Sequence, residues 1–153
     1  MIWPFRRKSK KRMARIVIDE PITSSTRVSA LKALKQIEDR EFPALILRID
    51  SPGGTVGDSQ EIYSAIKRLK DKGCKVIASF GNISASGGVY IGVASDKIVA
   101  NPGTITGSIG VIIRGNNLSE LLNKIGIKFE TVKSGIYKDI LSPDKPLSDE
   151  GRD

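Results

Sequence analysis

The sequence predicts an α/β fold in which a mostly parallel sheet is flanked by helices. Three observations predict it. Short apolar runs of strand length alternate with segments whose apolar residues recur at helical spacing, and turns containing glycine or proline separate them. The chain has 153 residues and is 39% hydrophobic, which is usual for one globular domain with an ordinary core. Strands and helices in alternation are typical of βαβ units, whose strands pair in parallel.

The segment from residue 14 to residue 73 is expected to form two strand–helix pairs. Strands are expected at 14–19 and 44–49, because both runs are short and apolar. The first helix is expected after the N-cap candidates at 24–26, with a core face of apolar residues: Val28, Leu31, Leu34 and Ile37. The second helix is expected after Asp58 and is stopped by Gly73, with this core face: Ile62, Ala65, Ile66 and Leu69.

The rest of the chain continues the alternation. Strands are expected at 76–80, 97–100, 108–113 and 128–133, and helices at 88–94 and 118–125. A further helix start, Ser148-Asp149-Glu150, has only three residues behind it, so the C-terminal part of the domain is expected to be missing. The predicted organisation is therefore a basic N-terminal arm at 1–13 and one domain at 14–153.

The net charge of +8 belongs to the arm. Seven basic residues precede the first acid and leave +1 for the remainder: Arg6, Arg7, Lys8, Lys10, Lys11, Arg12 and Arg15. The arm is interpreted as a disordered solvated tail, with contact to an anionic membrane surface or to nucleic acid as alternatives. No nucleic-acid partner is expected, because the body has no basic patch interleaved with aromatic residues.

Localisation is expected to be cytoplasmic, or peripheral at a membrane. The apolar part of the arm is far shorter than the roughly 20 residues that span a bilayer, and it has no signal-peptide core. Cys74 is the only cysteine, which excludes an intrachain disulfide and favours a reducing compartment. Its expected role is that of a small buried apolar residue.

The sequence contains no histidine, which excludes a Ser-His-Asp triad and any histidine-ligated metal. No metal and no cofactor are expected. A serine still needs a base to become a nucleophile. The turn at 81–88 offers Ser86, with Ser84 as a competing candidate, between a predicted strand and a predicted helix. Lys138 is a candidate base, because its neighbours Ile136, Tyr137 and Ile140 are apolar and burial lowers the pKa of a lysine.

Two glycine-containing turns are expected at the same edge of the sheet. The turn at 51–54 follows one predicted strand and the serine turn follows the next, and open α/β sheets bind ligands at this edge. Glycine allows close approach of the backbone to a substrate. The amides of Gly53 and Gly87 are therefore candidates for an oxyanion hole.

Four motifs occur in a fixed order: Ile49-Asp50-Ser51-Pro52-Gly53-Gly54, Ser84-Ala85-Ser86-Gly87-Gly88-Val89-Tyr90-Ile91, Thr106-Gly107-Ser108-Ile109-Gly110-Val111 and Ser134-Gly135-Ile136-Tyr137-Lys138-Asp139. Together they resemble the signal peptide peptidase A (SppA) family of serine–lysine peptidases, in the ClpP/crotonase superfamily. The resemblance spans residue 14 to the end of the chain. It implies a fold of repeated ββα units, with Ser86 as nucleophile and Lys138 as general base.

The resemblance also implies further roles. Gly53 and Gly87 would donate the oxyanion-hole amides, and Ser108 would orient the lysine ammonium group. Substrates would be remnant signal peptides or other short unfolded peptides, and the chain would assemble into a homo-oligomeric ring in which neighbouring subunits can share the dyad. Many relatives carry an N-terminal transmembrane helix and continue well beyond the lysine loop. Here a basic arm is expected in place of such a helix, and the C-terminal portion is expected to be missing.

Two other functions remain open from the residues. One is a non-catalytic ring subunit or scaffold fragment. The other is a crotonase-type acyl-CoA enzyme, which usually needs carboxylates for proton transfer. The serine turn contains no acid, and Asp50 is the only one beside the glycine turn, so the peptidase is favoured over the acyl-CoA enzyme.

Overall fold

A computed structural model of the chain describes residues 12–135 and 137–147. The chain divides into two compact units, with the first ending at Gly110 and the second beginning at Val111. The arm predicted at 1–13 lies mostly outside the described residues, as do Ile136 and the helix start predicted at 148–150.

The described part of the first unit contains a five-stranded parallel sheet in the order β1-β2-β3-β4, with β5 also paired to β3. The strands are β1 (Ala14–Ile18), β2 (Ala44–Ser51), β3 (Lys75–Ala85), β4 (Lys97–Val99) and β5 (Ile105–Gly107). Both β4 and β5 lie along the same side of β3: β4 pairs with residues 77–79 and β5 with residues 83–85. The mostly parallel sheet predicted from the sequence is confirmed.

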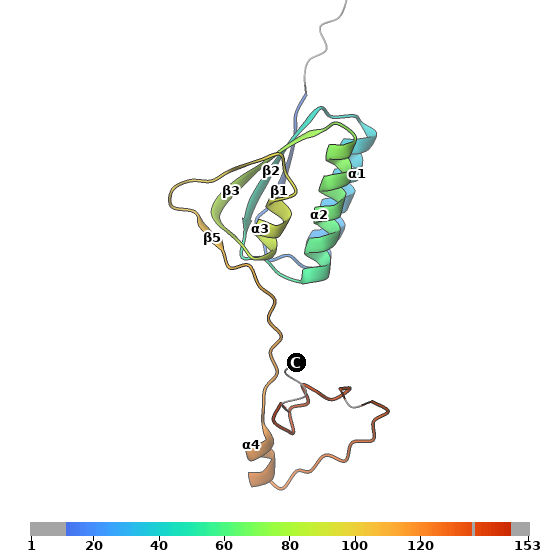
Figure 1. Ribbon diagram of the computed structural model, residues 1–153, viewed down its shortest axis with the longest axis vertical. Helices are drawn as coiled ribbons and strands as arrows, with labels where there is room; N and C mark the ends of the chain where they lie inside the picture. The colour runs from blue at the N-terminus through green and yellow to red at the C-terminus, as the bar shows by residue number, and fades with distance from the viewer. Residues whose placement is uncertain (1–11, 136, 148–153) are drawn as a thin grey trace, which may run out of the picture. The chain divides into compact units, whose positions relative to one another are not determined.

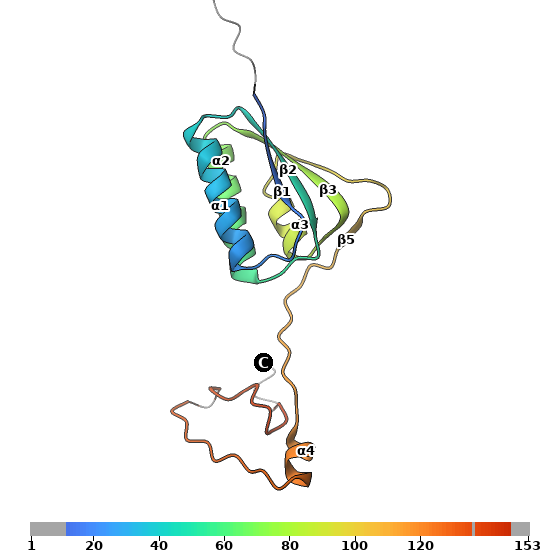
Figure 2. The ribbon, with the colours of Figure 1, turned by 180° about the vertical axis from the view of Figure 1, so that it is seen from behind.

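Three helices cover one face of this sheet, as both views of the ribbon show (Figures 1 and 2). They are α1 (Ser24–Asp39), α2 (Val56–Asp71) and α3 (Gly87–Gly92), and each connects two strands of the sheet. From β1 to β4 each strand pairs with the one before it. The connections between parallel strands have the same handedness, and each one leads to the next strand in the same direction across the sheet. All three connecting helices therefore lie on the same face.

The core lies between these helices and the sheet. In β2 every second residue is buried, so that Leu45, Leu47 and Ile49 face the helices and are at most 1% exposed. The intervening residues of β2 are half-buried on the opposite face. The core face predicted for α2 is confirmed, because its four members are all buried.

Two expectations about the first unit and the segment after it are wrong. Val28 was predicted on the core face of α1 but is 58% exposed, and that face consists instead of Thr26, Ala30, Leu34 and Ile37. No strand forms at 108–113, and the short strand β5 precedes it. The strand predicted at 76–80 is real but longer, since β3 continues to Ala85.

The second unit has one regular element among its described residues, α4 (Ser119–Lys124), where a helix was predicted at 118–125. The strand predicted at 128–133 does not form. Pairing with a neighbouring strand satisfies the backbone of a strand, and the described residues of this unit supply none. No helix in the described ranges has both the length and the apolar character needed to cross a membrane.

Candidate active site

The glycine turn and the serine turn meet at the carboxyl edge of the sheet. Ser51, at the end of β2, pairs in register with Ser84 near the end of β3. The turns that follow therefore lie side by side. A Cβ placed on Gly53 would lie 2.7 Å from the nitrogen of Gly87 and 2.8 Å from the Cβ of Ser86. Only glycine fits this contact.

Ser86 occupies a strained turn between β3 and α3. It is the N-cap of α3, with φ 50° and ψ −118°, a left-handed conformation that costs a residue with a side chain about 1–3 kcal/mol. Its N–H donates to the carbonyl of Gly107 at 2.8 Å, and its carbonyl accepts the N–H of Tyr90 at 3.0 Å. A sharp strand-to-helix turn of this kind presents a serine hydroxyl at the edge of an α/β sheet.

The two candidate serines differ in access. Ser84 is 0% exposed, and its Oγ has no hydrogen-bond partner among the described residues. Ser86 is only half-buried. A nucleophile must reach its substrate, so the geometry favours Ser86 over Ser84.

Backbone N–H groups gather beside Ser86. Gly87 is the first residue of α3, and the first amides of a helix have no intrahelical acceptor. Gly53 is buried, and its N–H donates to Ser51 Oγ at 3.2 Å. Gly54 is exposed, and its nitrogen lies 3.4 Å from where a Cβ of Gly87 would be. These N–H groups are hydrogen-bond donors beside the candidate nucleophile.

The segment between β1 and α1 clamps the glycine turn. Ile22, 0% exposed, donates its N–H to the carbonyl of Gly53 at 2.9 Å and accepts the N–H of Thr55 at 3.0 Å. Thr55 Oγ1 donates to the carbonyl of Ile22 at 3.4 Å and to the carboxylate of Asp58. The backbone on both sides of Gly54 is thus tied to a residue of the core.

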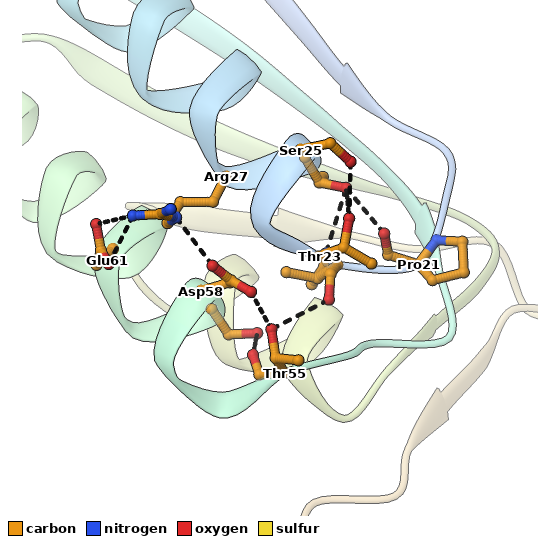
Figure 3. A network of polar contacts seen from close by, with 10 residues as sticks. Pro21, Thr23, Ser25, Arg27, Thr55, Asp58 and Glu61 are labelled. Carbon is orange, nitrogen blue, oxygen red and sulfur yellow. Dashed lines mark hydrogen bonds and ion pairs between the residues drawn. The ribbon is translucent and has the colours of Figure 1, made fainter.

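Charged side chains continue this clamp between the first turns of α1 and α2 (Figure 3). Arg27 of α1 pairs with Asp58 at 2.9 Å and with Glu61 at 3.0 Å, both on α2. The hydrogen bond to Glu61 is the main cause that raises the pKa of Arg27. Beside it, Thr26 Oγ1 donates to the carbonyl of Pro21 at 2.9 Å. The network fixes the start of α2 and, with it, the glycine turn.

The remaining predicted site residues fall in different parts of the chain. Ser108 follows Gly107, whose carbonyl accepts the Ser86 N–H, and it is exposed with φ 54°. The first unit therefore brings Ser86, Gly87, Gly53 and the 107–108 segment together. Lys138 belongs to the second unit, where its N–H reaches the carbonyl of Gly135 at 3.4 Å.

The burial expected for Lys138 is not found among the described residues of the second unit, which do not include Ile136. The side chain of Lys138 is exposed there, and Tyr137 is 57% exposed. Asp139, the next residue, pairs with Lys133 at 2.7 Å and with Lys145 at 2.5 Å. Hydrogen bonds from these two lysines, together with their charges, lower the pKa of Asp139 to about 2.

Two further sequence-based expectations concern cysteine and metals. Cys74 is 5% exposed, as expected, and burial raises the pKa of its thiol. Within the residues that the structure describes, no three cysteine, aspartate or glutamate side chains gather in a group able to hold a metal ion.

Sequence reasoning missed Arg48 and Asp50, which bind the backbone of β3. The available signal was their place in an otherwise apolar strand.

Comparison with solved structures finds proteins that share the fold over more than half of this chain. A mutant of the 1510-N membrane-bound stomatin-specific protease superposes with a TM-score of 0.57 at 28% identity, over 69% of this chain and 49% of that one. A second structure of that protease, in complex with a substrate peptide, gives the same TM-score at 29% identity, over 69% and 47%. ClpP1 from Listeria monocytogenes shares the fold at 19% identity, with a TM-score of 0.50 over 60% and 59%.

Curated relatives agree over most of the chain. The putative protease slr0021 of Synechocystis sp. is 61% identical over 147 residues, which are 96% of this chain and 53% of the relative. The putative signal peptide peptidase SppA of Enterococcus faecium is 44% identical over 124 residues, 80% of this chain and 36% of the relative. The chain thus spans about half the length of the first relative and about a third of the second.

The family model described as peptidase family S49 matches residues 68–153, more than half of the chain. The match includes the serine turn, the 107–108 segment and the lysine loop. With the relatives above, it shows that this chain belongs to peptidase family S49.

Proposed function

We propose that this chain is the catalytic part of a serine endopeptidase with a Ser–Lys dyad, with Ser86 as nucleophile and Lys138 as general base. The observation that carries the proposal is the strained conformation of Ser86, at φ 50°, beside the amides of two glycine-containing turns. Conformations of this kind persist only where the surrounding structure holds them, and they cluster at active sites.

The proposed chemistry is acyl transfer. Lys138 in its neutral form takes the proton of Ser86 Oγ, and the oxygen attacks the carbonyl carbon of a peptide bond. The negative charge that develops on the carbonyl oxygen is held by backbone N–H groups. The lysine then gives its proton to the leaving amine, and later activates a water molecule that releases the acyl group from Ser86.

Gly87 donates one oxyanion-hole amide in this proposal, and the glycine turn donates the other. Gly53 is the residue that the family resemblance assigns. Its N–H must exchange a hydrogen bond to Ser51 Oγ, which at 3.2 Å is long, for one to the substrate. Gly54, exposed beside Gly87, is the alternative donor in the same turn. Ser108 is proposed to orient the ammonium group of Lys138.

The proposed substrates are remnant signal peptides or other short unfolded peptides. Support comes from the resemblance to SppA proteins and from the substrate peptide bound to the 1510-N protease. The proposed assembly is a homo-oligomeric ring in which neighbouring subunits can share the dyad. This assembly would let Lys138, exposed within its own unit, reach a nucleophile and lose solvent contact.

The test is cleavage of a fluorogenic peptide of small and apolar residues. Ser86→Ala and Lys138→Ala are each expected to lower kcat about a thousandfold, because nucleophile and base act as a unit. Ser84→Ala and Lys128→Ala, matched changes at a buried serine and an exposed lysine, should leave kcat unchanged. Equal loss in Ser84→Ala and Ser86→Ala contradicts the assignment. A parent chain that cleaves no peptide favours the scaffold alternative, and turnover of an acyl-CoA thioester favours the crotonase-type enzyme.

A further inference from the structure

The strand that leads into Ser86 is bent where its pairing with β2 is interrupted. Ile49 of β2 is paired with Phe80 of β3, but the next partner of Ser84 is Ser51. Two steps along β2 therefore correspond to four steps along β3. Residues 81–83 therefore leave the regular ladder with β2, and the backbone groups that face β2 need other partners.

Two charged side chains of β2 bind β3 at this irregularity: Arg48 binds the residues just before it, and Asp50 binds the backbone within it. Arg48 Nη1 donates to the carbonyl of Phe80 at 2.9 Å and to Ser79 Oγ at 3.0 Å. Asp50 Oδ1 accepts the N–H of Ile83 at 3.0 Å. The backbone N–H groups of Ile83 and of Asn82, together with the charge of Arg48, lower the pKa of the Asp50 carboxyl group.

Two threonines from the other side of β3 add further hydrogen bonds to its backbone. Thr104 Oγ1 donates to the carbonyl of Gly81 at 2.8 Å, and Thr106 Oγ1 donates to the carbonyl of Ser84 at 2.9 Å. Hydrogen bonds to charged groups are stronger than those between neutral groups. The two ionic side chains of β2 are therefore expected to dominate the geometry of the bend.

The carboxylate of Asp50 lies directly against the backbone of Gly81. A Cβ added to Gly81 would lie 2.3 Å from both Cγ and Oδ2 of Asp50. Real side chains never approach so closely, so Gly81 and Asp50 require each other. Gly81 allows the carboxylate to approach the N–H groups that follow.

We propose that Arg48 and Asp50 are positioning residues for the nucleophile: they fix the bend at 81–83 and thereby set the path of the backbone into the strained Ser86. The inference rests on the proposed function, because it assigns a catalytic purpose to the geometry at Ser86. Both lie on β2, half-buried, at positions that alternate with those facing the helices.

The first experiment compares Asp50→Asn with the parent chain in peptide cleavage. Loss of the carboxylate weakens its acceptance of the two N–H groups, and Ser86 is displaced from its productive position. A displacement on the order of 1 Å can cost up to about a hundredfold in rate, and we expect kcat to fall about tenfold with KM unchanged. Asp71→Asn, the same change at an exposed position at the end of α2, should leave both constants unchanged.

A second measurement does not depend on activity. Amide hydrogen exchange at Asn82 and Ile83 should become about tenfold faster in Asp50→Asn, while exchange in the 44–49 part of β2 stays the same. If the parent chain cleaves no peptide, the proposed function fails. Unchanged local exchange then also overturns the positioning role, whereas local acceleration supports the bend mechanism.

Gly81→Ala provides an independent variant of the same contact. Its Cβ pushes the carboxylate away, so we expect the double variant Gly81→Ala/Asp50→Asn to lose no more kcat than the worse single variant. Additive losses would overturn the proposal. Two results for Asp50→Asn would also overturn it. One is a uniform rise in amide exchange over the first unit, which indicates general destabilisation, and the other is a local rise in exchange with kcat unchanged. Arg48→Lys, which keeps a donor, should retain more kcat than Arg48→Gln.

Discussion

The two units of the chain differ in how far their apolar side chains are buried. In the first unit Ile62 is 0% exposed between α2 and the sheet, whereas in the second unit Val132 is 102% exposed. Six further apolar residues of the second unit, between 111 and 129, are more than half exposed: Val111, Ile112, Ile113, Leu121, Ile125 and Phe129. The first unit builds its own core, whereas the described residues of the second unit form none.

This difference bears on the proposed dyad, whose members lie in different units. The strained turn at Ser86 is surrounded by buried backbone and by the hydrogen bonds of the clamp. Lys138 is exposed within the described residues of its own unit. The proposed nucleophile is thus held by the packing of the first unit, whereas the proposed base would need packing from outside its own unit to lose contact with solvent.

The largest expected effect compares one apolar residue from each unit. Ile62→Ala should lower the free energy of unfolding by about 2–5 kcal/mol, because it removes a fully buried side chain and leaves a cavity. Val132→Ala should change it by less than about 0.5 kcal/mol, as expected for an exposed position. Chemical denaturation measures both. A cost of 2 kcal/mol or more for Val132→Ala would break the comparison, because it requires that this side chain be buried in solution.

A smaller effect compares two glycines with positive φ. Gly53 (φ 97°) would place a Cβ against Gly87 and Ser86, whereas Gly126 (φ 76°) has nothing within 4 Å of that position. Gly53→Ala should cost about 3 kcal/mol, from the left-handed backbone and the steric clash, and should abolish peptide cleavage. Gly126→Ala should cost about 1 kcal/mol, from the backbone alone. Equal costs in denaturation would show that the glycine turn is not held against the serine turn.

The same contrast explains which parts of the fold could be predicted from the sequence. The face of α2 was predictable because Ile62, Ala65, Ile66 and Leu69 repeat at helical spacing and all pack on the sheet. The meeting of the two glycine-containing turns followed from the rule that parallel strands end at one edge. In α1 the spacing of apolar residues did not predict the buried face correctly. Thr26 is buried and donates a hydrogen bond to the carbonyl of Pro21, while Val28 faces outward.

The longer β3 could not be predicted from its own residues. Gly81 and Asn82 normally favour a turn, but Arg48, Asp50 and Thr104 satisfy the backbone around this bend, so the strand continues to Ala85. The residues that determine the length of β3 therefore lie in other segments of the chain. The left-handed backbone of Ser86 is likewise set by its surroundings. The strands predicted at 108–113 and 128–133 had suitable residues but no neighbouring strand to pair with.

The smallest expected effect compares one carboxylate from each unit. Asp139 of the second unit has its pKa lowered to about 2, chiefly by hydrogen bonds from Lys133 and Lys145. Asp96 of the first unit has its pKa lowered chiefly by the N–H of Val76, which it accepts at 2.8 Å. In both cases the folded state favours the charged form. The stabilisation is therefore complete above the ordinary carboxyl pKa of about 4, and for Asp139 it is lost as the pH falls toward 2.

Salt should separate the two carboxylates. The lysines that pair with Asp139 are about a third exposed, so 1 M salt should screen them and move the pKa of Asp139 back toward its ordinary value. The backbone N–H that holds Asp96 carries no net charge, so its pKa should move less. Carboxyl-carbon NMR titrations at low and high salt measure both shifts, and Asp139→Asn identifies the signal. A salt-independent Asp139 would mean that its lysines are shielded from solvent, and the second unit would then resemble the first in how it holds its charges.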